Sequence, residues 1–352
     1  MRRLFRFAAA KVPRISATER IALRSGTVGI EREAFAGTLS ARTLLERYTP
    51  ATPTANDVAM LGRVPDLLRT VDEYDTLRAR GTPASHPFWA HARAHDFFGL
   101  IVPEEYGGTP LSSTGLSRLL QRLASCSASA PVHIMVPASL GPAELLVHYG
   151  TDAQRARWLP RLARGAIPCF GLTSLEAGSD AAGSMVDTGT VERGADGSVR
   201  LRLSCRKRYI TLAPVADVVG LAFKVVDPDG LLGAQCGRPV DGEITLALVE
   251  RGAAGLRLGE RLDPLGVGFE NGLVDAEDLV LCPVADVIGG LNGVGQGWKY
   301  LMEALAAGRG VALPAGAAGS TKMLTCATSG YAALRTQFKV PLIEFEGVQE
   351  KV

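Results

Sequence analysis

A loop of small and hydroxyl-bearing residues near the middle of the chain combines residue types that can bind a charged or aromatic group. The segment reads Phe170-Gly-Leu-Thr-Ser-Leu-Glu-Ala-Gly-Ser-Asp180 and passes from a short apolar run into Gly178-Ser179-Asp180. Its backbone N–H groups and hydroxyls come with little side-chain bulk, which suits a pyrophosphate or an electron-rich ring. A second cluster, Lys207-Arg-Tyr-Ile-Thr-Leu212, follows further along the chain. We expect the binding chemistry to centre on these two segments.

Other catalytic and ligand-binding signatures are incomplete in this sequence. The glycines at 293, 295 and 297 are spaced G-x-G-x-G instead of G-x-G-x-x-G, and no strand–helix–strand pattern surrounds them. This spacing argues against a dinucleotide fold. The sequence also has no G-K-[ST] phosphate loop and no G-x-S-x-G nucleophile turn. His91 and His95 could share one helix face, but two ligands without a neighbouring acid favour packing, so we expect no metal.

Composition limits the class of protein. With 352 residues, 47% of them hydrophobic, the chain can bury one large core or two to three smaller ones. The net charge is +2 and basic residues are not interleaved with aromatic ones, so we expect no nucleic-acid partner. The six cysteines form no C-x-x-C pair, which indicates buried free thiols in a reducing cytoplasm.

The sequence contains no run of 18 apolar residues, so no bilayer span is expected. The segment Met1–Lys11 is basic with short apolar pieces. It is interpreted as a frayed chain end, with a weak membrane-surface or targeting segment as the alternative. The location predicted from these features is the cytoplasm, with the inner face of the membrane as a peripheral alternative.

Apolar periodicity divides the chain into helical and strand-forming parts. Leu116, Leu119, Leu120 and Leu123 form one helix face, and Thr151–Gln154 fits a capping box. Leucines and valines then alternate with polar residues over 199–204, after a hairpin turn at 195–197, and strand-length apolar runs cover 217–226 and 243–250. Helical periodicity returns over 298–305, and a second helix is expected from about 315 to 335.

This order predicts an α+β fold: an N-terminal helical domain, a middle antiparallel β-domain and the start of a C-terminal helical domain. The expected boundaries are an N-terminal extension at 1–50, the helical domain at 51–168, the β-domain at 169–288 and an incomplete helical domain at 289–352.

Taken jointly and in order, several motifs resemble those of the acyl-CoA dehydrogenase family. They are the segments 99–108, 148–154, 158–165, 170–180 and 209–211, Gly295-Gln-Gly-Trp298 with Arg309, and Arg335-Thr-Gln-Phe338. Three details are most similar to the bacterial enzymes of long-chain fatty-acid degradation. These are Pro168-Cys-Phe-Gly-Leu-Thr-Ser174, Arg208-Tyr-Ile-Thr-Leu-Ala-Pro214 and Gly308-Arg-Gly-Val-Ala-Leu-Pro314.

The resemblance implies FAD as cofactor and a fatty acyl-CoA as substrate. In this family pattern Thr173 would hydrogen-bond the isoalloxazine, Thr211 would lie near flavin N5, and Tyr209 could lie against the ring face. Ser179 would meet both flavin and CoA, and Arg309 would hold the CoA end. Arg335 and Gln337 would reach the FAD of a partner subunit, which implies a homo-oligomer. The full cofactor-binding set implied is Phe170, Leu172, Thr173, Gly178, Ser179, Tyr209, Ile210, Thr211, Arg335, Gln337 and Phe338.

The chain departs from the family pattern at the catalytic base. Glu176 is offset from the usual acid of the flavin loop, so no role is carried over to it. Most relatives place the base in a late E-G-x-N-type segment, and a minority place it immediately before the CoA-binding arginine, where this chain has Gly308. Glu344 and Glu346 lie in a different segment and are not assigned. We therefore assign no catalytic residue and expect the base beyond Val352, in a truncated chain that is inactive alone.

The expected reaction is FAD-dependent α,β-dehydrogenation of medium- or long-chain fatty acyl-CoA to trans-2-enoyl-CoA. A base removes the α-proton, the β-hydride passes to the flavin, and an electron-transfer flavoprotein is the expected acceptor. Two alternatives stay open: an acyl-CoA oxidase, which passes electrons to oxygen, and a non-catalytic binding or assembly remnant of the fold.

Overall fold

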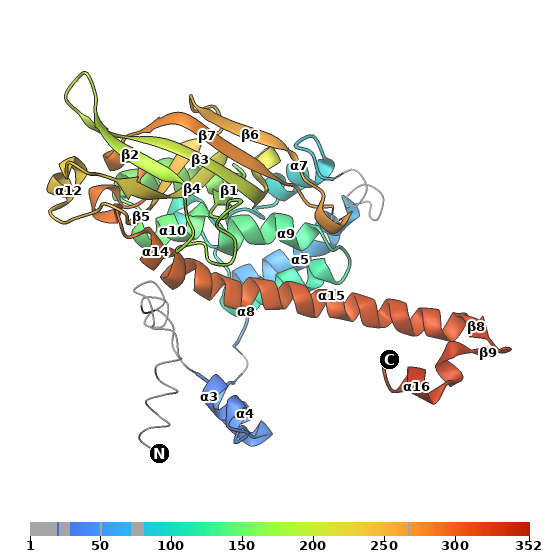
Figure 1. Cartoon of the computed structure of the whole chain (residues 1–352). Helices are drawn as coiled ribbons and strands as arrows, with labels where there is room; N and C mark the ends of the chain where they lie inside the picture. Colours follow the sequence, from blue (N-terminus) through green and yellow to red (C-terminus); the bar gives the residue numbers. More distant parts are fainter. Residues whose placement is uncertain (1–19, 21–28, 50, 72–80, 267) are drawn as a thin grey trace, which may run out of the picture.

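A computed structural model describes residues 20, 29–49, 51–71, 81–266 and 268–352 (Figure 1). The basic segment Met1–Lys11 therefore lies outside the described residues. Within the expected N-terminal extension, helices α3 (Glu31–Phe35) and α4 (Ala41–Arg47) bury none of their residues. Neither helix contributes to the core.

A group of helices follows and ends just before the first strand. Its members are α5 (Ala55–Arg69), α7 (Pro87–Ala94), α8 (Ser113–Ala124), α9 (Ala130–Met135), the π-helical turn η3 (Val136–Leu140), α10 (Pro142–Tyr149) and α11 (Asp152–Ala163). The four leucines of the predicted stripe are all buried on α8. The capping box of α11 is present, with Thr151 accepting from the Gln154 N–H and the Gln154 side chain accepting from the Thr151 N–H. Both predictions are confirmed.

The middle of the chain forms one seven-stranded sheet. Its strands are β1 (Pro168–Gly171), β2 (Thr188–Arg193), β3 (Val199–Thr211), β4 (Val218–Val226), β5 (Ile244–Glu250), β6 (Leu256–Arg261) and β7 (Asn271–Leu281), with the short helix α12 (Leu231–Cys236) between β4 and β5. The predicted turn at 195–197 joins β2 to β3, and the predicted strands at 217–226 and 243–250 are β4 and β5. The α+β class with a helical part before the sheet is confirmed.

The sheet is mixed and not purely antiparallel, which corrects one detail of the prediction. Among the described strands, β4 pairs with β5 in antiparallel fashion but runs parallel to both β1 and β2. Residues 218–221 of β4 pair with β1 and residues 224–226 pair with β2, so β1 and β2 lie one after the other along the same edge. The long connection between them is the loop that carries Thr173 and Ser179.

One long helix replaces the two helices expected after the sheet. After α13 (Pro283–Asp286) and η6 (Gly290–Gly293), a helical run passes through α14 (Gly297–Tyr300), the π-helical turn η7 (Leu301–Leu305) and α15 (Ala306–Leu334). Pro314 lies inside α15 without ending it. The helix packs along α8, where a Cβ at Gly319 would come within 2.3 Å of the Gln121 carbonyl oxygen. This close packing compensates for the helix-breaking tendency of proline.

The sheet lies over the helices α9 and α10 in this view, and α15 runs below these two helices, along α8, and extends past the body of the molecule (Figure 1). At its far end are the hairpin strands β8 (Thr336–Gln337) and β9 (Val340–Pro341), then η8 (Leu342–Glu344) and α16 (Glu346–Gln349). The segment Ala130–Tyr149 is long and apolar enough to cross a membrane, and 82% of its most apolar stretch is buried inside the protein.

The cysteines differ from the expectation that all are buried. All six are free; Cys169 and Cys205 are buried, whereas Cys126, Cys282 and Cys326 are exposed. Burial raises the pKa of the Cys169 and Cys205 thiols to about 12. The prediction was wrong for these three thiols, because composition alone does not say which face of an element a residue occupies.

Asp57 joins the beginnings of α5 and α8. Its carboxylate accepts from the Thr54 N–H at 2.8 Å, from the Ser112 N–H at 3.0 Å and from the Ser112 hydroxyl at 2.7 Å. Burial opposes ionisation, but these hydrogen bonds outweigh it and hold the pKa of Asp57 below its usual value. The ionised side chain therefore stabilises the folded state.

We predict that Asp57→Ala lowers the free energy of unfolding at pH 7 by about 2–3 kcal/mol, as expected for hydrogen bonds to a charged group. Because the folded pKa is depressed, this stabilisation is present above the unfolded pKa of about 4 and is lost as pH falls through the folded value. Urea unfolding between pH 7 and pH 3 measures it. Asp66→Ala, which removes a half-exposed carboxylate of the same helix, is the control and should change stability by less than about 0.5 kcal/mol. Equal losses in the two variants would contradict the role of Asp57.

Candidate functional site

The two clusters singled out in the sequence meet in the structure. The loop after β1 lies against the last residues of β3, where Ser174 and Lys207 form an antiparallel bridge. The Thr173 hydroxyl donates to the Arg208 carbonyl oxygen at 3.1 Å, and the Arg208 N–H donates to the Thr173 carbonyl oxygen at 3.2 Å. Segments more than thirty residues apart in sequence therefore form one junction. We call the segments 171–180 and 207–212 the loop–strand junction.

A β-bulge in β3 presents the aromatic residue of this junction. Lys207 pairs with Val274 and Ile210 with Gly272, so β3 advances three residues while β7 advances two. The extra residue allows Tyr209 to adopt a left-handed backbone conformation, with φ of 57°, and its side chain is 49% exposed. The Arg208 guanidinium lies 4.9 Å from the centre of the Tyr209 ring. A phenol ring is thus held at the surface of the junction.

A buried ion pair lies directly beneath the junction. The Lys207 ammonium donates to Asp187 Oδ2 at 2.6 Å and to the Leu172 carbonyl oxygen at 3.0 Å. The Lys207 side chain has no exposed surface and that of Asp187 is 2% exposed. The sequence interpretation assigned no role to either residue. One signal was available, because Lys207 continues the inward-facing alternation of Leu201, Leu203 and Cys205 along β3.

Three polar atoms close to the junction have no hydrogen-bond partner among the described residues. They are Ser174 Oγ, Arg208 Nε and Asn271 Oδ1, and each is buried. Asn271 pairs with Thr211 across β3 and β7. A buried polar atom without a partner is costly, so such atoms indicate a place where a bound molecule or water completes the hydrogen bonding. They were not among the residues predicted from the sequence.

The other predicted cofactor residues of the junction have different surroundings. Phe170 packs against the strand next to it, where a Cβ at Gly220 would come within 2.4 Å of its ring. Ile210 is buried in the core, so only its backbone is available to a ligand. Leu172, Thr173 and Thr211 are half-buried.

Gly178 and Ser179 lie exposed on the outer part of the loop. The next residue shapes the chain after them, because the Asp180 carboxylate accepts from the Gly183 N–H and from the Ser184 hydroxyl, each at 3.0 Å. These bonds form a local turn that leaves the Ser179 side chain facing solvent.

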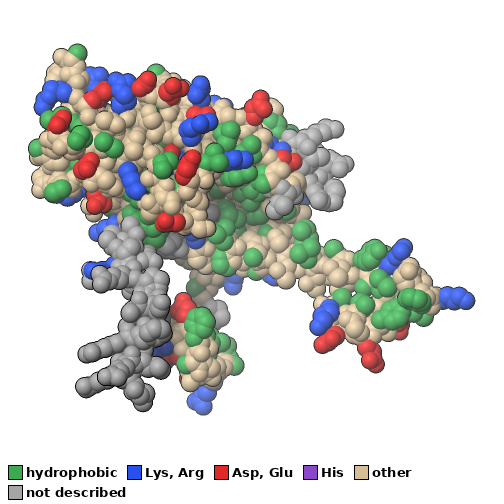
Figure 2. All heavy atoms as spheres, viewed as in Figure 1, with side chains coloured by type: hydrophobic (Ala, Val, Ile, Leu, Met, Phe, Trp, Pro, Cys, Tyr) green, Lys and Arg blue, Asp and Glu red, His purple; other side chains and the backbone are tan. Residues whose placement is uncertain are grey.

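The structure does not bring Arg335, Gln337 and Phe338 to the junction. They lie at the hairpin β8–β9 beyond the end of α15, far from the sheet (Figure 1). All three are exposed, Phe338 by 88%, and hydrophobic side chains gather at this end of the arm (Figure 2). A role toward the site of a partner subunit, as the family resemblance implies, stays a prediction.

Gly308, the position where a minority of relatives carry the base, is closed to side chains. A Cβ there would lie 2.3 Å from the Ser139 carbonyl oxygen of η3. The following residue, Arg309, is exposed on α15. Glu344 and Glu346 belong to η8 and α16 at the far end of the arm, away from the junction (Figure 1).

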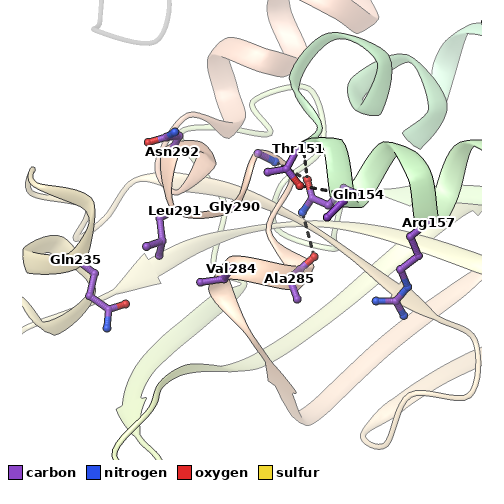
Figure 3. Close-up of a pocket in the computed structure, with 11 residues that line it drawn as sticks. Thr151, Gln154, Arg157, Gln235, Val284, Ala285, Gly290, Leu291 and Asn292 are labelled. Carbon is purple, nitrogen blue, oxygen red and sulfur yellow. Dashed lines mark hydrogen bonds between the residues drawn. The ribbon is translucent and has the colours of Figure 1, made fainter.

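Two cavities differ in their chemistry. A cavity of about 650 Å³ lies between α11 and η6, where the Gln154 amide donates to the Ala285 and Val287 carbonyls and accepts from Thr151 and Gly289 (Figure 3). The Gln154 amide is thus fully used by the protein and has no hydrogen-bonding capacity left for a ligand.

A second cavity of about 550 Å³ lies where the segment after the loop and the end of β4 face the start of α14. Three cations, Lys224, Arg238 and Lys299, line it beside a single carboxylate, that of Glu243. We call it the cationic cavity. Arg238 is held in place because its guanidinium donates to the carbonyls of Asn292 and Val294. An excess of positive charge of this kind suits phosphate groups.

Comparison with known proteins relates part of the chain to one family. Residues 66–166 match the family described as acyl-CoA dehydrogenase, N-terminal domain. The chain is 31% identical over 256 residues to the protein named "Probable acyl-CoA dehydrogenase FadE10" of Mycobacterium tuberculosis, and 31% identical over 265 residues to the human mitochondrial very long-chain specific acyl-CoA dehydrogenase. These alignments cover 72% and 75% of this chain but 37% and 38% of the relatives, so the chain spans little more than a third of their length.

Solved structures share the fold at lower identity. The butyryl-CoA dehydrogenase of Megasphaera elsdenii aligns with 86% of this chain and 75% of its own, with a TM-score of 0.70 and 22% identity. An acyl-CoA dehydrogenase of Bacillus anthracis, solved in complex with FAD, aligns with 86% of this chain and 48% of its own, with a TM-score of 0.70 and 24% identity. Residues 66–166 therefore carry the N-terminal domain of the acyl-CoA dehydrogenase family, and the chain shares the fold of solved acyl-CoA dehydrogenases.

The packing at Gly308 can be tested with a neighbouring glycine as the control. Gly308→Ala should lower the free energy of unfolding by about 1–3 kcal/mol, because the new methyl group would overlap the Ser139 carbonyl. Gly310→Ala, in the same helix and with open space around it, should raise stability by up to about 1 kcal/mol. Thermal or urea unfolding of the pair decides the matter. Similar gains in both variants would show that α15 does not approach η3 this closely.

Proposed function

We propose that this chain provides the FAD-binding and acyl-CoA-binding parts of an enzyme that dehydrogenates fatty acyl-CoA between its α and β carbons. The observation that carries the proposal is the loop–strand junction, where the Thr173 loop and the Tyr209–Thr211 strand end meet beside unpartnered buried polar atoms. Hydroxyls, an exposed aromatic ring and unused hydrogen-bonding atoms in one place fit the polar edge and flat face of an isoalloxazine.

The chain's own residues would bind and orient the cofactor at this junction. FAD supplies the acceptor for the hydride that leaves the β carbon. Thr173 and Thr211 offer hydroxyl groups for its polar edge, and Tyr209 offers an aromatic face. The unpartnered Ser174 and Asn271 side chains add two further polar groups. Gly178 and Ser179 leave the outer loop open for the phosphate side of the ligand.

The acyl-CoA would bind next to this loop. The segment that begins with Ser179 continues into the cationic cavity, whose wall includes Ala182 and Gly183. Lys224, Arg238 and Lys299 supply the positive charge that the phosphates of CoA require. Arg309 is exposed and could hold the CoA end, as the family resemblance implies.

The general base is not assigned to any described residue. Gly308 has neither a titratable group nor room for one, and Glu344 and Glu346 are remote from the junction. We therefore propose that the proton is removed by a group outside the 352 residues, so that this chain binds its ligands without turning them over. A long acyl chain is favoured by the motifs shared with the bacterial long-chain enzymes.

The proposed partners follow from this chemistry. An electron-transfer flavoprotein would accept the electrons, and a second subunit would cover the exposed apolar side chains at the end of α15, which include Tyr331, Leu334 and Phe338. The cytoplasm, with the inner membrane face as the alternative, stays the proposed location.

FAD binding gives the first test. Thr173→Ala and Thr211→Ala should each weaken FAD binding about threefold to tenfold, the effect of one lost hydrogen bond. Flavin fluorescence titration of the purified chain measures the dissociation constant. Thr190→Ala, at an exposed position of β2, is the matched control and should leave it unchanged. No FAD binding by the unaltered chain, or equal affinities in all variants, would refute the assignment of the site.

Turnover gives the second test. The 352-residue chain, loaded with FAD, should reduce an artificial electron carrier with a fatty acyl-CoA no faster than a substrate-free control, because the proposal places the base outside this chain. Parallel measurement of oxygen consumption separates the oxidase alternative. Substrate-dependent reduction or oxygen uptake at ordinary enzyme rates would show that a base is present within the chain.

A further inference from the structure

We infer that Lys207 and Asp187 form a positioning clamp that holds the loop–strand junction in one geometry. The inference rests on the proposed function for its consequence, since the junction is the proposed cofactor site. Its structural content is independent of any ligand. Neither residue is a catalytic residue, because both are buried beneath the surface that a ligand would touch.

The first half of the clamp connects Lys207 to the loop. Its ammonium donates to the Leu172 carbonyl oxygen at 3.0 Å, and its backbone bridges Ser174. The stem of the side chain passes over Gly171, where a Cβ would come within 3.1 Å of Lys207 Cγ. The lysine therefore contacts the loop on both sides of Thr173, whose hydroxyl is one of the predicted ligand groups.

The second half connects the ion pair to the sheet. Asp187 precedes β2, and its Oδ1 accepts from the Arg206 N–H of β3 at 3.0 Å while Oδ2 accepts from Lys207. The Asp187 carbonyl oxygen accepts from the Lys224 N–H of β4 at 2.9 Å. Backbone groups of two strands thus fix Asp187, and its carboxylate in turn holds the Lys207 ammonium group in one position.

The energetics favour a geometric role over a stabilising one. Removing two charges from water offsets most of the attraction between them, so a buried ion pair contributes little net stability compared with apolar side chains. Its atoms nevertheless need defined partners, and a partly satisfied arrangement is strongly disfavoured. The pair therefore selects one position of Leu172 relative to β3. Thr173 follows Leu172 directly, and Tyr209 and Thr211 follow Lys207, so both halves of the proposed site are set by the same contact.

A double-mutant cycle separates positioning from charge burial. Lys207→Met, Asp187→Asn and the double variant are compared with Arg206→Met, which replaces an exposed cation on the opposite face of β3. Hydrogen–deuterium exchange is followed at the amides of Ser174 and Arg208, which donate to Ala177 and Thr173 of the loop. Amides of β5 serve as the internal reference, and FAD affinity and flavin circular dichroism are measured on the same samples.

Lys207→Met should accelerate exchange at the amides of Ser174 and Arg208 about tenfold to a hundredfold relative to the amides of β5, because the hydrogen bond to the Leu172 carbonyl is lost. The double variant should regain global stability, since no buried charge lacks a partner, but its loop amides should stay fast. FAD affinity and the flavin circular dichroism should follow the loop and not the melting temperature. If Lys207→Met does not fold, the double variant carries the same comparison.

Two results would overturn the clamp: wild-type exchange in the loop of the double variant, or unchanged exchange in both lysine variants. A failure of the proposed function would give a different result from a failure of the clamp. If the unaltered chain binds no FAD, the cofactor assignment is wrong, whereas the exchange data still decide whether the ion pair positions the loop.

Discussion

A single buried lysine constrains the loop–strand junction, which is the proposed cofactor site. β3 alternates inward and outward along its length, and position 207 faces inward, where an apolar residue would be expected. A cation in that place requires a carboxylate and a carbonyl, and Asp187 and Leu172 supply them. Three segments distant in sequence are thereby fixed to one another. The bulge at Tyr209 follows two residues later, so its position depends on the same anchor.

The helices depend on a different constraint, close approach of backbones. Gly308 and Gly319 allow α15 to lie against η3 and α8 at distances that any side chain would prevent. The same closeness removes the possibility of a carboxylate at 308. Close helix packing requires glycine at position 308, and a catalytic base there would require a carboxylate. In this chain the residue at 308 is the one that packing requires. The arm beyond Leu334 contrasts with this dense contact, because its apolar side chains stay exposed, Phe338 most of all, although Phe338 packs edge to face against Phe345.

Local signals in the sequence predicted much of the fold. The leucine stripe of α8, the capping box of α11 and the strands β4 and β5 follow from short-range periodicity and capping chemistry. The parallel pairing of β1 and β2 with β4 and the continuity of the helix through Pro314 did not follow, because both depend on contacts between distant residues. The site divides in the same way. The motifs predicted Thr173 and Tyr209 as site residues, and the structure places them at one junction, whereas Asp187 and Asn271 become visible only when their strands are paired.

The bulge in β3 also determines which sequence changes this region can accept. Its one extra residue offsets the alternation of side chains, so that Ile210 returns to the core and Tyr209 faces outward. Deletion of a single residue between Lys207 and Ile210 would leave Ile210 facing the core opposite Gly272, but it would remove the bulge and one of the two positions between these residues. Replacement of a side chain here changes one contact, but loss of a residue would remove the left-handed position from which the Tyr209 ring reaches the surface. The region should therefore vary in residue type within homologous chains while keeping a fixed count of residues.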